Sequence, residues 1–363
     1  INCIWSPVEC ALIKHIPKAA RSSCATHLAK LLRDVVAKPD CQESWLAVFN
    51  WGGSVLQPPK RGGKKHNVTS TIKKRISSFP SNPVVVPHST KRCESSRTVL
   101  AQAVASKLED GNIRAAIRLL CSEDTTALPS ESNLEKLRDK HPAATLVTES
   151  LPTPTQYTHL SVDESEVRKA VFSFPTGSSG GPDGLRPQHL KDLVQCRESG
   201  ADFLTALTAF VNMVLSGRCP AKVAPVFFGG RLLALNKKSG GIRPIAVGFT
   251  LRRLVSKCAN SFGTARLSSF FTPAQVGVGT AGGCEAAVHS TRRFLECMPT
   301  DHVVVKLDFS NAFNCLHRGE MLQSVADHVP ELYPYCFSAY SNPSVLFYGQ
   351  YKILSQEGPQ QGD

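Results

Sequence analysis

The pattern of apolar residues changes along the chain, from helical stripes to strand-like segments near residue 223. Phe203, Leu207, Phe210 and Val214 fall on one face of a helix, and Gly217 is suited to end it. From residue 223, two apolar segments are joined by the turn sequence NKKSGG, which predicts a β-hairpin. A chain with separate helical and strand regions is typical of the α+β class.

Further helices and a second hairpin follow from the same patterns. Ser161 and Glu164 match a capping box that starts a helix ending before Pro175. Apolar residues at helical spacing predict packed helices over 97–108 and 113–120, and another helix is expected over 250–267. The dipeptide Gly349-Gln350 fits a two-residue turn between two short strands.

The composition favours a globular, nucleic-acid-binding protein inside the cell. Of 363 residues, 42% are hydrophobic, and the net charge of +13 indicates a polyanionic partner, although basic surfaces also serve solubility. The 13 cysteines include no CxxC pair, so we expect reduced thiols in the nucleus or cytoplasm. No run of 18 apolar residues predicts a membrane span.

Residues 58–75, PPKRGGKKHNVTSTIKKR, form a strongly basic segment rich in turn-forming residues. Such a segment is either a solvated linker or an arm that binds phosphates, and the overall charge favours the arm. The candidate contacts are Lys60, Arg61, Lys64, Lys65, Lys73, Lys74 and Arg75.

The stretch HVVVKLDFSNAFNCLHR, residues 302–318, predicts a strand buried on both faces that ends at Asp308. A carboxylate at a strand end suits a divalent metal, and nucleotidyl transfer uses two Mg²⁺ ions roughly 4 Å apart. Alternatively, Asp308 caps a helix starting at Ser310. The predicted hairpin adds Lys237, Lys238 and Arg243 around one glycine-containing turn, where cations could hold a triphosphate.

Five stretches, in order, resemble the successive motifs of reverse transcriptases encoded by non-LTR (LINE-type) retrotransposons. They are GGPDGLRPQHL, LLALNKKSGGIRPIAV, AQVGVGTAGGCEAAVH, VVVKLDFSNAFNCLHR and GPQQGD, within residues 160–363. The resemblance implies a right-hand polymerase fold with fingers and a partial palm, whose antiparallel sheet packs on helices. It divides the chain into a mostly helical basic N-terminal region with a linker (1–90), a helical region leading into the fingers (91–159), the fingers with the start of the palm (160–300) and a truncated palm (301–363).

The resemblance also assigns roles to individual residues. Asp308 would bind catalytic Mg²⁺ together with the carbonyl of Phe309, and Phe313 would exclude the ribose 2′-OH. The residues implied in binding dNTP are Lys237, Lys238, Arg243, Asn311, Ala312, Phe313, Gln361 and Gly362. Those implied in binding template are Gly181, Pro182, Asp183 and Gly184.

The family pattern also includes a Tyr-X-Asp-Asp turn and a thumb, which these residues do not contain. We therefore expect a fragment that is inactive alone, from an enzyme whose partners are an RNA template, a DNA primer or target, and dNTP. Two alternatives stay open: an RNA-dependent RNA polymerase, and a non-enzymatic nucleic-acid-binding remnant. The ring of Phe313 argues against the first.

Overall fold

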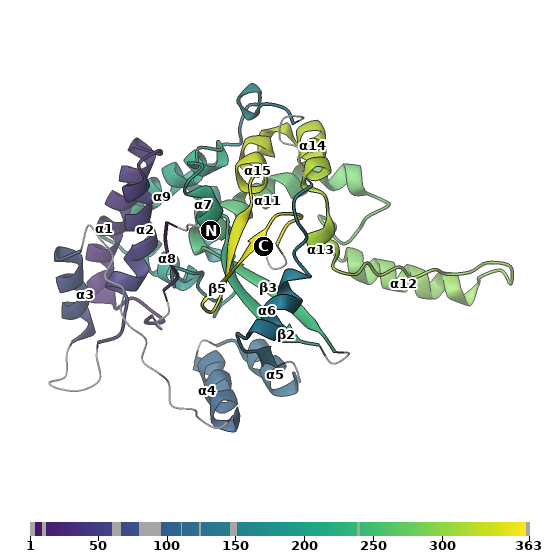
Figure 1. Ribbon diagram of the computed structural model, residues 1–363, viewed down its shortest axis with the longest axis horizontal. Coiled ribbons are helices and arrows are strands. Elements are labelled where there is room, and N and C mark those ends of the chain that lie inside the picture. The colour runs from purple at the N-terminus through teal and green to yellow at the C-terminus, as the bar shows by residue number, and fades with distance from the viewer. Residues whose placement is uncertain are drawn as a thin grey trace.

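The described residues form a mostly helical molecule with one small sheet (Figure 1). The computed structural model describes residues 4–8, 12–59, 67–79, 96–109, 111–122, 125–145, 151–237 and 240–360. The helices are α1 (Lys18–Ala37), α2 (Gln42–Val55), α3 (Val68–Ser77), α4 (Ser96–Glu109), α5 (Ile113–Cys121), α6 (Glu131–Arg138), α7 (Glu164–Phe172), α8 (Pro187–Val194), α9 (Gly200–Leu215), α10 (Ala224–Phe227), α11 (Thr250–Phe271), α12 (Gly283–Glu296), α13 (Ala312–Cys315), α14 (Arg318–His328) and α15 (Tyr333–Tyr340). The strands are β1 (Thr126–Ala127), β2 (Gly230–Asn236), β3 (Ile242–Gly248), β4 (Ser344–Tyr348) and β5 (Tyr351–Ser355). Short 3₁₀ turns span Pro154–Gln156 and Pro330–Leu332.

The sheet contains both predicted hairpins. Strands β2 and β3 pair antiparallel with Asn236 opposite Ile242, and β4 and β5 pair around Gly349, whose φ is +56°. Strand β2 also pairs parallel with β4, so the sheet is mixed, whereas an entirely antiparallel sheet was expected. The α+β expectation is therefore confirmed at the level of class.

The largest hydrophobic core joins the N-terminal helices to the central helices. Trp45 of α2 lies fully buried against Phe210 of α9 and Phe227 of α10, with ring centroids 5.6 and 5.2 Å apart. Helix α1 packs along α9 through residues such as Leu28 and Leu32. The described residues before 80 thus share a core with residues 160–259, although the sequence suggested a region of their own up to residue 90.

Local expectations for four helices needed correction. The capping box of α7 is formed by Asp163 and Glu166, since Val162 is held by Asn212 before the helix starts. Helices α4 and α5 exist and contact each other, but Leu108 and Ile117 are 53% and 54% exposed rather than packed in a core. The basic segment ends in α3, which Asn67 caps and Ile72 anchors, so residues 68–75 are no linker.

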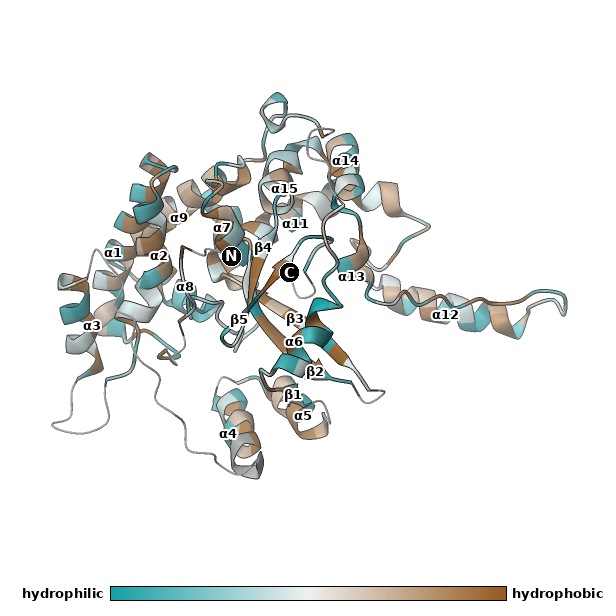
Figure 2. Ribbon diagram, in the orientation of Figure 1, coloured by the Kyte–Doolittle hydropathy of each residue, from teal (hydrophilic) through white to brown (hydrophobic). Residues whose placement is uncertain are grey.

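The predicted strand over 303–308 is wrong. Residues 302–309 lie outside the sheet, and Val303, Val305 and Leu307 are 71–81% exposed. A strand needs neighbours for its backbone groups, and no described strand pairs with this segment. It runs beside α12, which projects away from the rest of the molecule in Figure 1. Figure 2 shows hydrophobic colour along strands of the sheet such as β2 and β4.

Across the described parts of the chain, no helix is both long enough and apolar enough to traverse a bilayer.

Candidate functional site

Two of the motif stretches meet in space at a close backbone contact. Gly358 has φ +57°, and a Cβ atom built on it would lie 1.8 Å from the carbonyl oxygen of Phe313. The turn before Phe313 is also fixed, because Asn311 adopts φ +56° and its Nδ2 donates to the carbonyl of Lys140 at 2.9 Å. Asn314 donates to the same carbonyl at 2.9 Å. The turn at 311–314 is therefore held on the carbonyl of Lys140, with Phe313 O close against Gly358.

A buried hydrogen-bond network around Arg318 holds these two stretches together. The Arg318 amide donates to Glu357 Oε2 at 2.8 Å, and the guanidinium donates to Gly358 O at 3.2 Å and Ser355 Oγ at 3.0 Å. Burial lowers the pKa of Arg318 to about 10. Burial alone would raise the pKa of Glu357, but hydrogen bonds from Thr145 and the Arg318 amide outweigh it and lower the pKa. Both groups remain charged at neutral pH.

Gln360 is the last described residue of this site, and its side chain is buried and hydrogen-bonded within it. It is 4% exposed, and its Nε2 donates to Phe228 O at 3.0 Å and Ser344 Oγ at 2.8 Å. Its Oε1 accepts from Arg252 Nη1 at 3.2 Å, and the same Nη1 donates to Phe228 O at 2.5 Å. The segment leading to residue 361 is consequently held against the start of β2 and β4.

Asp308 and Phe309 lie on the exposed segment that precedes the 311–314 turn. The side chain of Asp308 is exposed and that of Phe309 is 77% exposed. One carboxylate and one carbonyl supply two oxygen ligands, whereas Mg²⁺ prefers six in octahedral geometry. Among the described residues no group of three His, Cys, Asp or Glu side chains could hold a metal. The residues described here do not fit a complete Mg²⁺ site by themselves.

The predicted dNTP residues fall in two places. Lys237 and Arg243 are exposed at the tip of the β2–β3 hairpin, where the Lys237 amide donates to Gly241 O at 3.0 Å. Ala312 and Phe313 are exposed in the 311–314 turn, Phe313 by 57%. The predicted residues Lys238, Gln361 and Gly362 lie outside the described residues.

The GGPDG loop is buried more deeply than a surface template contact would be. A Cβ on Gly181 would lie 2.6 Å from Gly248 O, and Pro182 O accepts from the Val8 amide at 2.8 Å. Gly184 has φ +73°. Asp183 is 2% exposed, and burial raises the pKa of its carboxyl to about 7. Because the Asp183 side chain is buried, the groups of this loop that could contact a ligand are the backbone atoms of its glycines.

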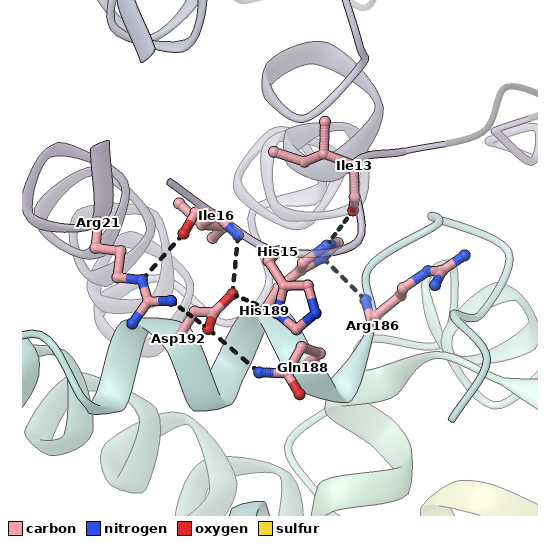
Figure 3. Close-up of polar contacts among 8 residues, drawn as sticks. All are labelled: Ile13, His15, Ile16, Arg21, Arg186, Gln188, His189 and Asp192. Carbon is pink, nitrogen blue, oxygen red and sulfur yellow. Dashed lines mark hydrogen bonds and ion pairs between the residues drawn. The ribbon is translucent and has the colours of Figure 1, made fainter. Parts of the chain in front are cut away.

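A polar cluster ties the N-terminal segment to α8, just after this loop (Figure 3). Asp192 accepts from the Ile16 amide at 2.8 Å and from Arg21 Nη2 at 2.7 Å. His189 contacts Ile13 O through Nε2 at 2.7 Å and accepts from the Arg186 amide through Nδ1 at 3.2 Å. Burial lowers the pKa of His189 to about 4, so Nε2 donates and the ring is neutral at pH 7.

A cleft of about 450 Å³ opens beside the GGPDG loop. Its walls are the N-terminal residues around Val8, the backbone of Gly180 and Gly181, and the β4–β5 turn at Tyr348. Among the described residues, Arg186 and Arg231 are the charged lining residues of the cleft, and none of the lining residues is acidic. Arg231 also donates to Val8 O at 3.0 Å, which positions that wall. The cleft therefore suits an anionic chain.

The described part of the predicted basic arm lies on α3. Lys73 and Lys74 are exposed, whereas Arg75 donates to the carbonyls of Val55, at 3.4 Å, and Gln57. Arg75 therefore closes the end of α2. The other four predicted arm residues, Lys60, Arg61, Lys64 and Lys65, lie outside the described residues.

Comparison with known proteins leaves the sequence without a match, either among protein-family models or among curated proteins. Sequence reasoning missed the residues that organise this site: the buried Arg252, Arg318, Glu357 and Gln360, and the half-buried Arg231 of the cleft. Arg318 and Gln360 stand inside two of the motif stretches, which is the signal that could have found them.

Proposed function

We propose that this chain is part of an RNA-directed DNA polymerase, a reverse transcriptase of a non-LTR retrotransposon. The observation that carries the proposal is the order of the five motif stretches along residues 160–363. The close approach of Gly358 to Phe313 supports it, because two stretches separated in sequence meet where the proposed nucleotide site would lie. The +13 net charge fits the nucleic-acid partners.

Each part of the site has a role in this proposal. The cleft with Arg186 and Arg231 would take the RNA template, with the glycine backbone of the 180–184 loop allowing close approach. The exposed ring of Phe313, on a turn fixed by Asn311, would form a steric wall beneath the sugar of dNTP. Lys237 and Arg243 would contact its phosphates. Asp308 would be one of several metal-binding acids, the others being supplied by a Tyr-X-Asp-Asp turn beyond residue 363.

The template part of the proposal is tested by RNA binding. Arg186→Gln should reduce the slope of log Kd against log salt by about 0.7, since each phosphate contact on a single strand releases counterion in that proportion. Arg266→Gln is the matched control, because Arg266 is an exposed arginine of α11 that does not line the cleft. An unchanged slope for Arg186→Gln would place the RNA elsewhere.

The catalytic part is tested by primer extension. A longer form of the protein that includes a Tyr-X-Asp-Asp turn should synthesise DNA on an RNA template, and Asp308→Asn should abolish synthesis without changing template binding. The 363-residue chain should not extend a primer. Vigorous DNA synthesis by these residues alone would contradict the proposal that the acids are incomplete.

The two alternatives predict different results. An RNA-dependent RNA polymerase would incorporate ribonucleotides, which Phe313 should prevent, so Phe313→Val in the longer form should admit rNTP. Unchanged discrimination would refute the role of the ring. A non-enzymatic nucleic-acid-binding remnant is favoured because no group of three His, Cys, Asp or Glu side chains among the described residues could hold a metal. It predicts a reading frame that ends without a Tyr-X-Asp-Asp turn.

A further inference from the structure

A second cavity, of about 480 Å³, lies at the opposite end of β4 from the cleft. The loop at 154–159, the C-terminal turn of α9 and helix α15 form its walls. Ser341 and Asn342 line it just before β4 begins, whereas Phe347 and Tyr348 line the cleft at the end of that strand. A strand rises about 3.3 Å per residue, so the two sites are separated by roughly 17 Å along β4.

Two aromatic rings line this cavity and are held in place. Tyr157 packs against Tyr333, with ring centroids 4.8 Å apart, and Phe337 packs against the same ring at 5.8 Å. The hydroxyl of Tyr333 donates to Pro152 O at 2.7 Å, and the Leu160 amide donates to Glu331 O at 2.9 Å. These contacts fix the 152–160 loop on α15, so the two rings are preformed walls.

The polar lining has one sign of charge. Arg218 is exposed at the rim, where its Nε donates to Ser216 Oγ at 3.0 Å. His159 is also exposed, and the remaining polar side chains are neutral. Within the described part of the chain, no aspartate or glutamate lines the cavity. Gly217, with φ +79°, turns the chain so that Arg218 follows α9 directly, and it packs against Pro334 O. The lining thus favours an anion.

We propose that this cavity binds a nucleotide unit, with its base between or against the rings of Tyr157 and Phe337 and its phosphate on Arg218. A volume of about 480 Å³ is in the range of ligand sites, which run from about 300 to 1,000 Å³. Base stacking on aromatic rings tolerates all four bases, and a guanidinium can fork onto phosphate oxygens. The proposal does not depend on the polymerase proposal, because it uses none of the same residues.

Fluorescence anisotropy with fluorescein-labelled 5′-AMP tests the proposal on the 363-residue protein. Arg218→Ala should weaken binding roughly tenfold, because a charge-assisted phosphate contact is lost. Arg218→Lys should weaken it less, since the charge stays. Phe337→Leu should lower the apparent affinity of unlabelled AMP, measured by competition, more than it lowers that of inorganic phosphate. Arg266→Ala is the control expected to change binding less than twofold, because Arg266 is exposed and lines neither cavity.

Three results would overturn the proposal. The first is no saturable binding of AMP at millimolar concentration, and the second is equal competition by inorganic phosphate and AMP, which would mean a simple anion site. The third is a loss on Arg186→Ala that matches the loss on Arg218→Ala, which would place the nucleotide in the cleft. Thermal melting of each variant shows whether the fold is intact, and Arg218→Lys keeps the test valid if the alanine variant unfolds.

The nucleotide unit could come from free nucleotide or from a nucleic-acid strand, and the same assay separates them. A strand source predicts that a labelled ten-nucleotide single strand binds more tightly than AMP, and that Arg218→Ala weakens binding of the strand. A free-nucleotide source predicts that AMP binding is sensitive to Arg218 while binding of the strand is not. Either result supports the nucleotide site.

Discussion

Replacing Asp183 by asparagine should stabilise the protein at neutral and alkaline pH. The carboxyl is 2% exposed, and its Oδ1 accepts from the Leu185 amide at 3.2 Å, a contact that the asparagine Oδ1 can keep. Burial raises the pKa from its ordinary 3.8 to about 7, although Arg231 and Arg253 oppose the rise. Above pH 7 the native state must therefore bury a charge that the unfolded chain exposes to water.

The magnitude follows from linkage between protonation and folding. The folded state binds one proton more than the unfolded state between about pH 4 and 7, so the stabilising contribution of Asp183 is complete below pH 4 and is lost as pH rises through 7. At about 1.4 kcal/mol per pH unit, the charged carboxylate costs on the order of 4 kcal/mol above pH 7. Asparagine does not titrate, so it avoids this cost.

His189 has the opposite pH dependence and must be separated from Asp183. Its pKa falls from 6.5 to about 4 on burial, so its contribution is present above pH 6.5 and is lost as pH falls through 4. The two slopes nearly cancel between pH 4 and 6.5 in the unmodified protein. The difference in unfolding free energy between the Asp183→Asn variant and the unmodified protein removes the contribution of His189.

Urea unfolding at pH 5, 6, 7 and 8 gives this difference. We expect the variant to gain about 1.4 kcal/mol per pH unit from pH 5 to 7 relative to the unmodified protein, and to gain little more at pH 8. Asp327→Asn is the control, since Asp327 is exposed and asparagine keeps the Oδ1 atom that accepts a hydrogen bond from Gln323 Nε2. The same difference at pH 5 and pH 8 would refute a buried carboxyl that titrates near pH 7.

Three other variants test the remaining contacts. Asp192→Ala should lower the unfolding free energy by on the order of 3 kcal/mol, measured by urea unfolding, because Arg21 and the Ile16 amide lose their buried acceptor. A change below 1 kcal/mol would show that the polar cluster between the N-terminal segment and α8 does not stabilise the fold. Gly358→Ala should cost roughly 3 kcal/mol or more, since it combines positive φ with a clash on Phe313 O, and limited proteolysis should show cleavage near residue 358 before the core opens. Replacing Lys73 and Lys74 together by glutamine should lower the salt slope of RNA binding by up to about 1.4, and an unchanged slope would show that α3 has no phosphate contact.

Much of the fold could be predicted because it depends on local pattern. The stripe on α9, the proline at the start of α8, the long helix α11 and both hairpins follow from apolar spacing and turn residues, which act within a few positions. The start of α7 was predicted two residues early, because Ser161 and Asp163 both suit a cap and only the Val162–Asn212 contact decides between them.

The strand prediction for residues 303–308 was wrong because a strand depends on distant neighbours and not on local pattern. A run of β-branched residues states only that a strand is possible, while its formation depends on neighbouring strands. In the described structure none is beside it, so Val303 and Leu307 remain exposed.

The sequence by itself determined the class of the fold, the basic character of the molecule and the motif stretches that suggest a polymerase. The tertiary structure decided which of their residues are surface groups and which hold the site together. Asp183 and Arg318 look alike as charged residues in motifs, yet both are buried, one with a raised and one with a lowered pKa. Burial and pairing arise when distant segments of the chain pack together. No local sequence pattern therefore specifies which charged side chain will be desolvated.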